Sequence, residues 1–96
     1  SYAMNAPMNG QTAPRLVSAV ATGTRLALTW QAGSGSPFGY IIERSNAATG
    51  PFTAIAGVEA SATTFTDVTY NRNRQQFYRL RPADNPTVIS NVVGST

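Results

Sequence analysis

The feature that most constrains this fold is a strict alternation of apolar and other residues in RLALTWQ, residues 25–31. Leu26, Leu28 and Trp30 fall on one side of an extended chain, and smaller or polar residues fall on the other. Successive side chains of a β-strand point to opposite faces, so this pattern predicts a strand with one buried face. No segment shows the 3.6-residue spacing of an amphipathic helix. We therefore expect an all-β protein.

Six further segments have strand character, and turns rich in Gly, Pro, Asn and Ser separate them. The predicted strands are residues 15–20, 25–31, 38–45, 52–58, 63–68, 77–81 and 88–93. Short strands with turn residues between them are typical of an antiparallel β-sandwich. Seven strands, one tryptophan on an early strand and 96 residues fit the immunoglobulin-like class, while the absence of cysteine argues against an antibody-type domain.

The predicted core follows from the apolar positions of these strands. Trp30 shares its face with Leu26 and Leu28, so we interpret it as a core residue and not as an exposed platform for a sugar. The expected core residues are Leu16, Leu26, Leu28, Trp30, Tyr40, Ile42, Phe65, Tyr78, Leu80 and Val92.

An ordered set of motifs resembles the fibronectin type III family. The motifs are Pro14, Leu28-Thr29-Trp30, GYIIERS at 39–45, TGPF at 49–52, Phe65-Thr66-Asp67, FYRLR at 77–81 and SNVV at 90–93. Each motif alone is weak, but together they cover nearly all of residues 14–94 in the order of the family. The resemblance implies a seven-stranded sandwich in which strands A, B and E face strands G, F, C and C′.

One departure from the family lies at the start of strand F. There the family usually has a leucine followed by the tyrosine of the tyrosine corner, whose hydroxyl bonds back to the backbone. In this chain the corresponding residues are Tyr70 and Gln76. The usual corner hydrogen bond is therefore not expected. Two alternatives stay open: Tyr70 supplies a substitute, or Phe77 marks a register slip of one residue.

Composition removes several classes of chemistry. The chain has no cysteine and no histidine, so it has no thiolate nucleophile, no disulfide and no imidazole general base. We expect no cofactor and no metal, because a calcium site needs 6–8 oxygen ligands and no such loop is present. All seven basic residues are arginine, and the net charge of +3 is below what we would require of a nucleic-acid-binding protein. No apolar run is long enough to span a membrane.

The four carboxylates, Glu43, Glu59, Asp67 and Asp84, lie on four different segments. A glycosidase needs two carboxylates facing each other across roughly 5–10 Å, and nothing in this spacing brings two together. We expect Asp67 to bond loop backbone amides, as Asp does in turns. The adjacent Glu43 and Arg44 fall on opposite faces of their strand, with the Arg44 stem covering the edge of the core. We predict that the domain is not an enzyme.

A candidate binding face comes from strands C and F, which are neighbours in the implied topology. Its residues are Ile41, Glu43, Phe77, Arg79 and Arg81, which should share the outer face. Glu43 can pair across the strands with Arg79 or Arg81, and such a pair stabilises a sheet by about 0.2–1 kcal/mol. We favour this structural interpretation. The alternative is a binding surface, because guanidinium groups beside apolar side chains suit glycans, acidic polymers or a neighbouring domain.

The predicted domain spans residues 14–96, preceded by a vector remnant (SYAM) and linker over residues 1–13. Proteins that resemble this domain lead us to expect a non-catalytic accessory or spacer module of a larger secreted or cell-surface bacterial protein, such as a polysaccharide-degrading enzyme. The alternative is a glycan- or protein-binding module that uses the face defined above. A third hypothesis, a hydrolase, predicts an activity that Glu43→Gln would remove.

The expected partners are neighbouring domains of the parent chain and, for the binding alternative, a polysaccharide or a protein. We expect neither nucleic-acid binding nor membrane insertion, and a monomer for the isolated domain.

Overall fold

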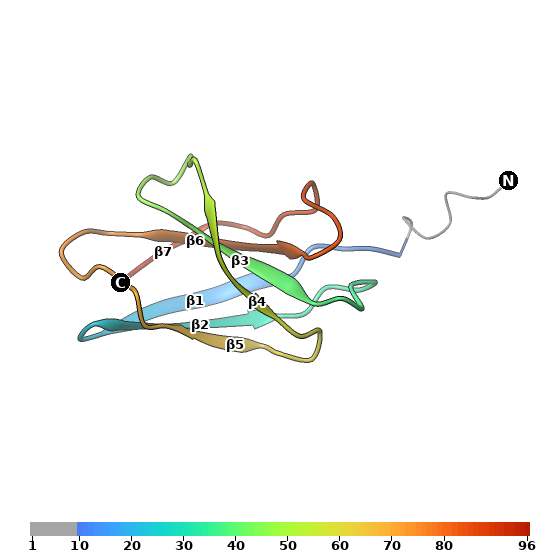
Figure 1. Ribbon diagram of the computed structural model, residues 1–96, viewed down its shortest axis with the longest axis horizontal. Coiled ribbons are helices and arrows are strands. Elements are labelled where there is room, and N and C mark those ends of the chain that lie inside the picture. Colours follow the sequence, from blue (N-terminus) through green and yellow to red (C-terminus); the bar gives the residue numbers. More distant parts are fainter. Residues whose placement is uncertain (1–9) are drawn as a thin grey trace, which may run out of the picture.

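The computed structural model describes residues 10–96, which form two antiparallel β-sheets packed face to face (Figure 1). The three-stranded sheet has the order β1-β2-β5, with β1 at Arg15–Thr22, β2 at Arg25–Gln31 and β5 at Thr64–Asp67. The four-stranded sheet has the order β4-β3-β6-β7. Its strands are β4 at Thr53–Val58, β3 at Tyr40–Ser45, β6 at Phe77–Pro82 and β7 at Val93–Gly94. The predicted seven-stranded sandwich is confirmed, including its division of strands between the sheets.

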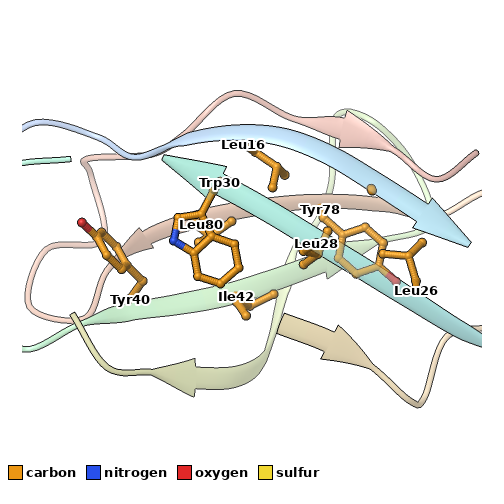
Figure 2. Packing of buried hydrophobic residues seen from close by; sticks show 9 residues of the cluster. Leu16, Leu26, Leu28, Trp30, Tyr40, Ile42, Tyr78 and Leu80 are labelled. Carbon is orange, nitrogen blue, oxygen red and sulfur yellow. The ribbon is translucent and has the colours of Figure 1, made fainter. Parts of the chain in front are cut away.

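The core lies between the sheets, where side chains of β1 and β2 meet those of β3 and β6 (Figure 2). Strand β2 alternates buried and exposed residues along its whole length, as its sequence predicts. Eight of the ten predicted core residues are buried, Ala19 joins them, and Phe65 packs against the cluster while half-buried. The buried residues are Leu16, Ala19, Leu26, Leu28, Trp30, Tyr40, Ile42, Tyr78 and Leu80.

The prediction for Val92 is wrong, because its side chain is 39% exposed and Val93 packs against the core in its place. The last strand is much shorter than the predicted 88–93, and Val93 pairs with Tyr78. Before it, the Ser90 hydroxyl accepts the hydrogen bond of the Leu80 amide at 2.8 Å, where a regular strand would offer a carbonyl. A shift of one residue along a strand moves its side chains to the opposite face. The irregular pairing therefore turns Val92 outward and Val93 toward the core.

A side-chain amide closes the edge between β1 and the segment before β7. Asn91 accepts a hydrogen bond from the Leu16 amide through Oδ1 at 2.8 Å and donates through Nδ2 to the Leu16 carbonyl at 2.9 Å. These are the two bonds that a neighbouring strand would make with Leu16. Asn91 therefore joins the two sheets along one side of the sandwich.

The described chain enters and leaves the sandwich at opposite ends (Figure 1). At the entry, Thr12 exchanges backbone and hydroxyl bonds with Ser34, and Gln11 bonds Asp84 and Asn85. These contacts attach the residues before β1 to the β2–β3 and β6–β7 loops. Residues 1–9 lie outside the described part of the chain, and the boundary between linker and domain stays a prediction.

The exit is attached in a similar way. The Ser95 amide donates to the Gln76 carbonyl at 2.8 Å, and the Gln76 amide donates to the Ser95 hydroxyl at 3.0 Å. The Thr96 amide donates to the Ala19 carbonyl of β1 at 3.2 Å. Both ends of the described chain are thus hydrogen-bonded to the body of the sandwich.

Candidate functional site

The five residues of the predicted face come together on β3 and β6 of the four-stranded sheet. Ile41 lies opposite Arg81, Glu43 opposite Arg79, and Ser45 opposite Phe77. The residues between them on both strands are buried in the core, so these five point away from it. We call this surface the outer face and define it by Ile41, Glu43, Phe77, Arg79 and Arg81.

Glu43 forms the centre of the outer face. The Arg79 Nε donates to its Oε1 at 2.7 Å, and the Arg81 Nε donates to its Oε2 at 3.1 Å. The sequence predicted a pair with one arginine or the other, and the structure has both. Although Glu43 lies on the outer side of the sheet, it is only 8% exposed because the two arginines cover it. Both carboxylate oxygens are therefore used within the protein.

Phe52 extends the outer face and was not predicted to belong to it. The guanidinium carbon of Arg79 lies 4.2 Å from the centre of the Phe52 ring, the geometry of a cation–π contact. Phe52 directly precedes β4, and β4 pairs with β3 so that Thr53 lies opposite Arg44. Without the bulge between Ile42 and Glu43, continuing the register would place Thr53 opposite Ser45. The bulge shifts the pairing by one residue, so Thr53 lies opposite Arg44 and the preceding Phe52 falls on the side of Glu43.

A second charged group connects the two sheets. Arg44 Nη1 of β3 donates to Asp67 Oδ2 of β5 at 2.8 Å, and the Tyr78 hydroxyl of β6 donates to the same oxygen at 2.7 Å. Asp67 Oδ1 accepts from the backbone amide of Thr69 at 2.9 Å, which confirms the predicted bond to a loop amide. The sequence did not predict the contacts with Arg44 and Tyr78.

Burial and hydrogen bonding act against each other at this group. Burial alone would raise the pKa of Asp67, but hydrogen bonds from Thr69, Tyr78 and Arg44 outweigh it and lower the pKa below the ordinary value. For Tyr78, burial and the nearby carboxylate both raise the pKa well above the ordinary value. Asp67 is therefore ionised and Tyr78 neutral at physiological pH.

Gln76 makes a bond of the kind that the tyrosine corner usually makes. Its Oε1 accepts from the Asn71 amide at 2.9 Å, and its Nε2 donates to Asn46 Oδ1 at 3.1 Å. The side chain is buried, and Tyr70 packs against the core. A glutamine amide thus bonds the backbone a few residues upstream, as the tyrosine hydroxyl does in related sandwiches. Phe77 lies on the outer face, so the structure does not support the alternative of a register slip.

The acidic side chains of residues 10–96 lie apart from one another. No three acidic, histidine or cysteine side chains in this range gather in a way that could hold a metal ion. Glu43 lies on the outer face and Asp67 between the sheets, while Glu59 and Asp84 are exposed in loops. The described residues contain no helix long and apolar enough to cross a membrane.

Comparison with known proteins gives matches among solved structures. No protein-family model matches the chain, and no curated protein matches it. An Fn3-like protein from Clostridium thermocellum is 28% identical with a TM-score of 0.78, and the match covers 91% of this chain and 93% of that one.

Two enzymes contain a similar domain as a small part of their length. Pectate lyase Pel3 from Pectobacterium carotovorum is 24% identical with a TM-score of 0.72, and the match covers 85% of this chain and 26% of that one. A β-1,2-glucanase from Parabacteroides distasonis is 20% identical with a TM-score of 0.69, and the match covers 88% of this chain and 12% of that one. At these identities the likeness concerns the fold alone. Together with the strand order, the matches show that this chain has a fibronectin type III-like fold.

Proposed function

We propose that this domain is a non-catalytic spacer module of a larger secreted polysaccharide-degrading protein. The observation that carries the proposal is the placement of the chain ends, which lie at opposite ends of the sandwich (Figure 1). Each end is hydrogen-bonded to the body of the domain, through Gln11 and Thr12 at one end and Ser95 and Thr96 at the other. Such a domain keeps the segments joined to its two ends at a fixed separation, whereas the end-to-end distance of a Gly/Ser linker varies widely.

The solved structures support the setting of this proposal. In the pectate lyase and the glucanase, the matched part is 26% and 12% of the chain, so a domain of this fold accompanies a much larger remainder in each. The names of both proteins describe enzymes that act on polysaccharides. The paired and buried Glu43 also suits a structural domain, because its two oxygens bond arginines and do not face a second carboxylate. Secretion is part of the same proposal.

The chain offers a direct test of stiffness because it has no cysteine. A Cβ on Gly10 would meet nothing within 4 Å, and Thr96 is exposed, so Gly10→Cys and Thr96→Cys provide two unique sites for spin labels. Pulsed electron-spin distance measurements should give one narrow distribution. Replacing Gln11 and Thr12 by alanine removes the side-chain hydrogen bonds at the entry and should broaden the distribution. A distribution in the starting protein as broad as that of a Gly/Ser chain of equal length would overturn the proposal.

The outer face supports a second candidate function, a binding surface for a glycan or a protein. The specific observation is the Phe52–Arg79 stack, which adds an aromatic ring to two partly exposed guanidinium groups. Aromatic rings and arginine are the side chains that most often dominate binding surfaces. Titration of the isotope-labelled domain with soluble polysaccharides tests this candidate. Shifts at the β3 and β6 amides would support it, and their absence across several glycans would reject glycan binding.

A further inference from the structure

A cleft of about 390 Å³ lies away from the outer face, on the side of the sandwich where β4 and the β5–β6 loop approach each other. It has the size of a small-molecule site, since such sites range from about 300 to 1,000 Å³. Its walls come from the end of β3, the β3–β4 turn, the first half of β4 and the loop over residues 68–76. None of the residues that line it is an Asp or a Glu.

Two arginines give the cleft its charge. Arg74 is exposed, and it has no carboxylate within ion-pair distance among residues 10–96. Arg44 also lines the cleft, and its Nη1 already bonds Asp67 and Thr69 on the inner side. Since Asp67 offsets one of the two positive charges, the site keeps an excess of one. A negatively charged group would be attracted to it.

Side-chain amides add hydrogen-bond donors whose direction the structure specifies. Asn46 Oδ1 accepts from Gln76, and Asn71 Oδ1 accepts from the Asn73 amide, so each oxygen is held by a bond within the protein. The Nδ2 groups of Asn46 and Asn71 donate to no residue in the described range. With the arginines, the cleft therefore offers many donors and few acceptors. A ligand that fits must supply acceptors, as carboxylates and hydroxyls do.

The remaining wall is apolar. Pro51 and Ile55 line the cleft, and Ile55 also packs against the core, which holds it in place. A sugar ring combines an apolar C–H face with hydroxyls along its edge, so it matches an apolar surface beside amide donors. A simple inorganic anion would use the arginines but leave this surface and the amides without a partner.

From these contacts we infer that the cleft binds an acidic saccharide, one whose sugar units carry carboxylates. Arg74 provides the main contact to a carboxylate, while Asn46 and Asn71 donate to hydroxyl or ring oxygens above Pro51. The choice of a saccharide rests on the proposed role in a polysaccharide-degrading protein. The binding claim and the spacer claim are tested by different measurements, so either can fail without the other.

The test is a titration of the isotope-labelled 96-residue protein, followed through its backbone amide signals. The probes are an oligomer of galacturonic acid and the same oligomer with its carboxylates methyl-esterified. We expect the acidic oligomer to shift signals of the β3–β4 turn and the β5–β6 loop, and the neutral ester to shift them little. Added salt should weaken the binding, since the attraction is electrostatic.

A matched pair of variants locates the site. Arg74→Gln removes an arginine from the cleft, and Arg72→Gln removes one from the same exposed loop but outside the cleft lining. The loss of charge is identical, so a difference between them reports position. We expect Arg74→Gln to weaken binding about tenfold, the usual effect of losing one hydrogen bond to a charged group, and Arg72→Gln to weaken it less than about threefold.

Several results would overturn the inference. One is the absence of any shift with about 10 mM oligomer, which would mean binding weaker than any useful site. Another is equal binding of the ester and the acid, which would exclude recognition of a carboxylate. A third is equal weakening by the two variants, which would mean attraction to the loop as a whole. Shifts confined to the outer face would reject the cleft and support the second candidate function.

Discussion

The substitution Asp67→Asn tests the polar group that connects the two sheets. Asparagine has nearly the same shape and keeps one oxygen, which can still accept the two bonds from Thr69. At the other position, an NH₂ donor would replace the oxygen that now accepts from Arg44 and Tyr78. The tyrosine hydroxyl can rotate and become an acceptor, but a guanidinium group has only donors. Arg44 therefore loses its carboxylate partner and keeps only the bond of its Nη1 to the Thr69 hydroxyl.

The expected cost follows from the burial of these groups. Asp67 is 2% exposed, and removing one partner of a buried ion pair costs about 3–5 kcal/mol. The Arg44 side chain is 23% exposed, so water replaces part of the lost contact and lowers the cost. We expect the free energy of unfolding to fall by about 2–4 kcal/mol. This is a large share of the roughly 5–15 kcal/mol that holds a small domain folded.

Urea unfolding measures this change directly. Trp30 is the only tryptophan and is 2% exposed, so its fluorescence reports the loss of the core. Glu59→Gln is the matched control, because it removes one carboxylate from an exposed position and should change stability by less than about 0.5 kcal/mol. An Asp67→Asn protein as stable as this control at neutral pH would refute the reasoning.

The pH dependence gives an independent check on the same group. Because the folded-state pKa of Asp67 is lowered, its contribution to stability is fully present above the unfolded-state pKa of about 3.9. It is lost as the pH falls through the lower pKa of the folded state. The stability difference between the starting protein and Asp67→Asn should therefore shrink on acidification. A difference that stays constant down to about pH 2 would contradict the assigned role.

Three further predictions concern other parts of the sandwich. Gly39 has φ of 86°, and an added Cβ would collide with the Val58 carbonyl, so Gly39→Ala should cost about 2–4 kcal/mol in urea unfolding; a cost below about 1 kcal/mol would contradict this. Asn91→Ala leaves the amide and carbonyl of the buried Leu16 without their partners and should cost about 1–3 kcal/mol, with faster amide hydrogen exchange at Leu16 as its specific sign. Because the pKa of Tyr78 is raised in the folded state, its neutral hydroxyl contributes fully to stability below the unfolded-state pKa of about 10. The free energy of unfolding should therefore fall as the pH rises above about 10, and Tyr78→Phe should make that fall smaller.

The sequence alone was sufficient for the strands and for most of the core. The alternation in β2 predicted the burial of Leu26, Leu28 and Trp30, because the side-chain period of a strand is a local property of the backbone. The same reasoning placed Glu43 on the outer side of β3, opposite the arginines of β6. The resemblance to fibronectin type III proteins supplied the order of the strands, which no local pattern contains.

Local patterns were less reliable at the ends of strands. The prediction of a regular last strand put Val92 in the core, whereas Ser90 and Asn91 interrupt that strand with side-chain hydrogen bonds and Val93 is the residue that packs. A serine hydroxyl or an asparagine amide can take the place of a backbone group, and the sequence does not show which one will. Gln76 provides a second example, since its amide bonds the backbone upstream as a tyrosine hydroxyl does in immunoglobulin-like sandwiches.

Only the tertiary structure determined the contacts between the sheets and the cleft beside them. Arg44 and Asp67 are 23 residues apart, and they meet because the connection between β4 and β5 takes the chain from one sheet to the other, where the two sheets pack together. Phe52 reached Arg79 through a bulge that strand alternation does not predict. The donors of the cleft come from a turn and a loop that are distant in sequence, and strand periodicity carries no information about where two loops meet. The alternation of side chains thus determined which residues face inward, and the packing of the two sheets decided which polar groups meet.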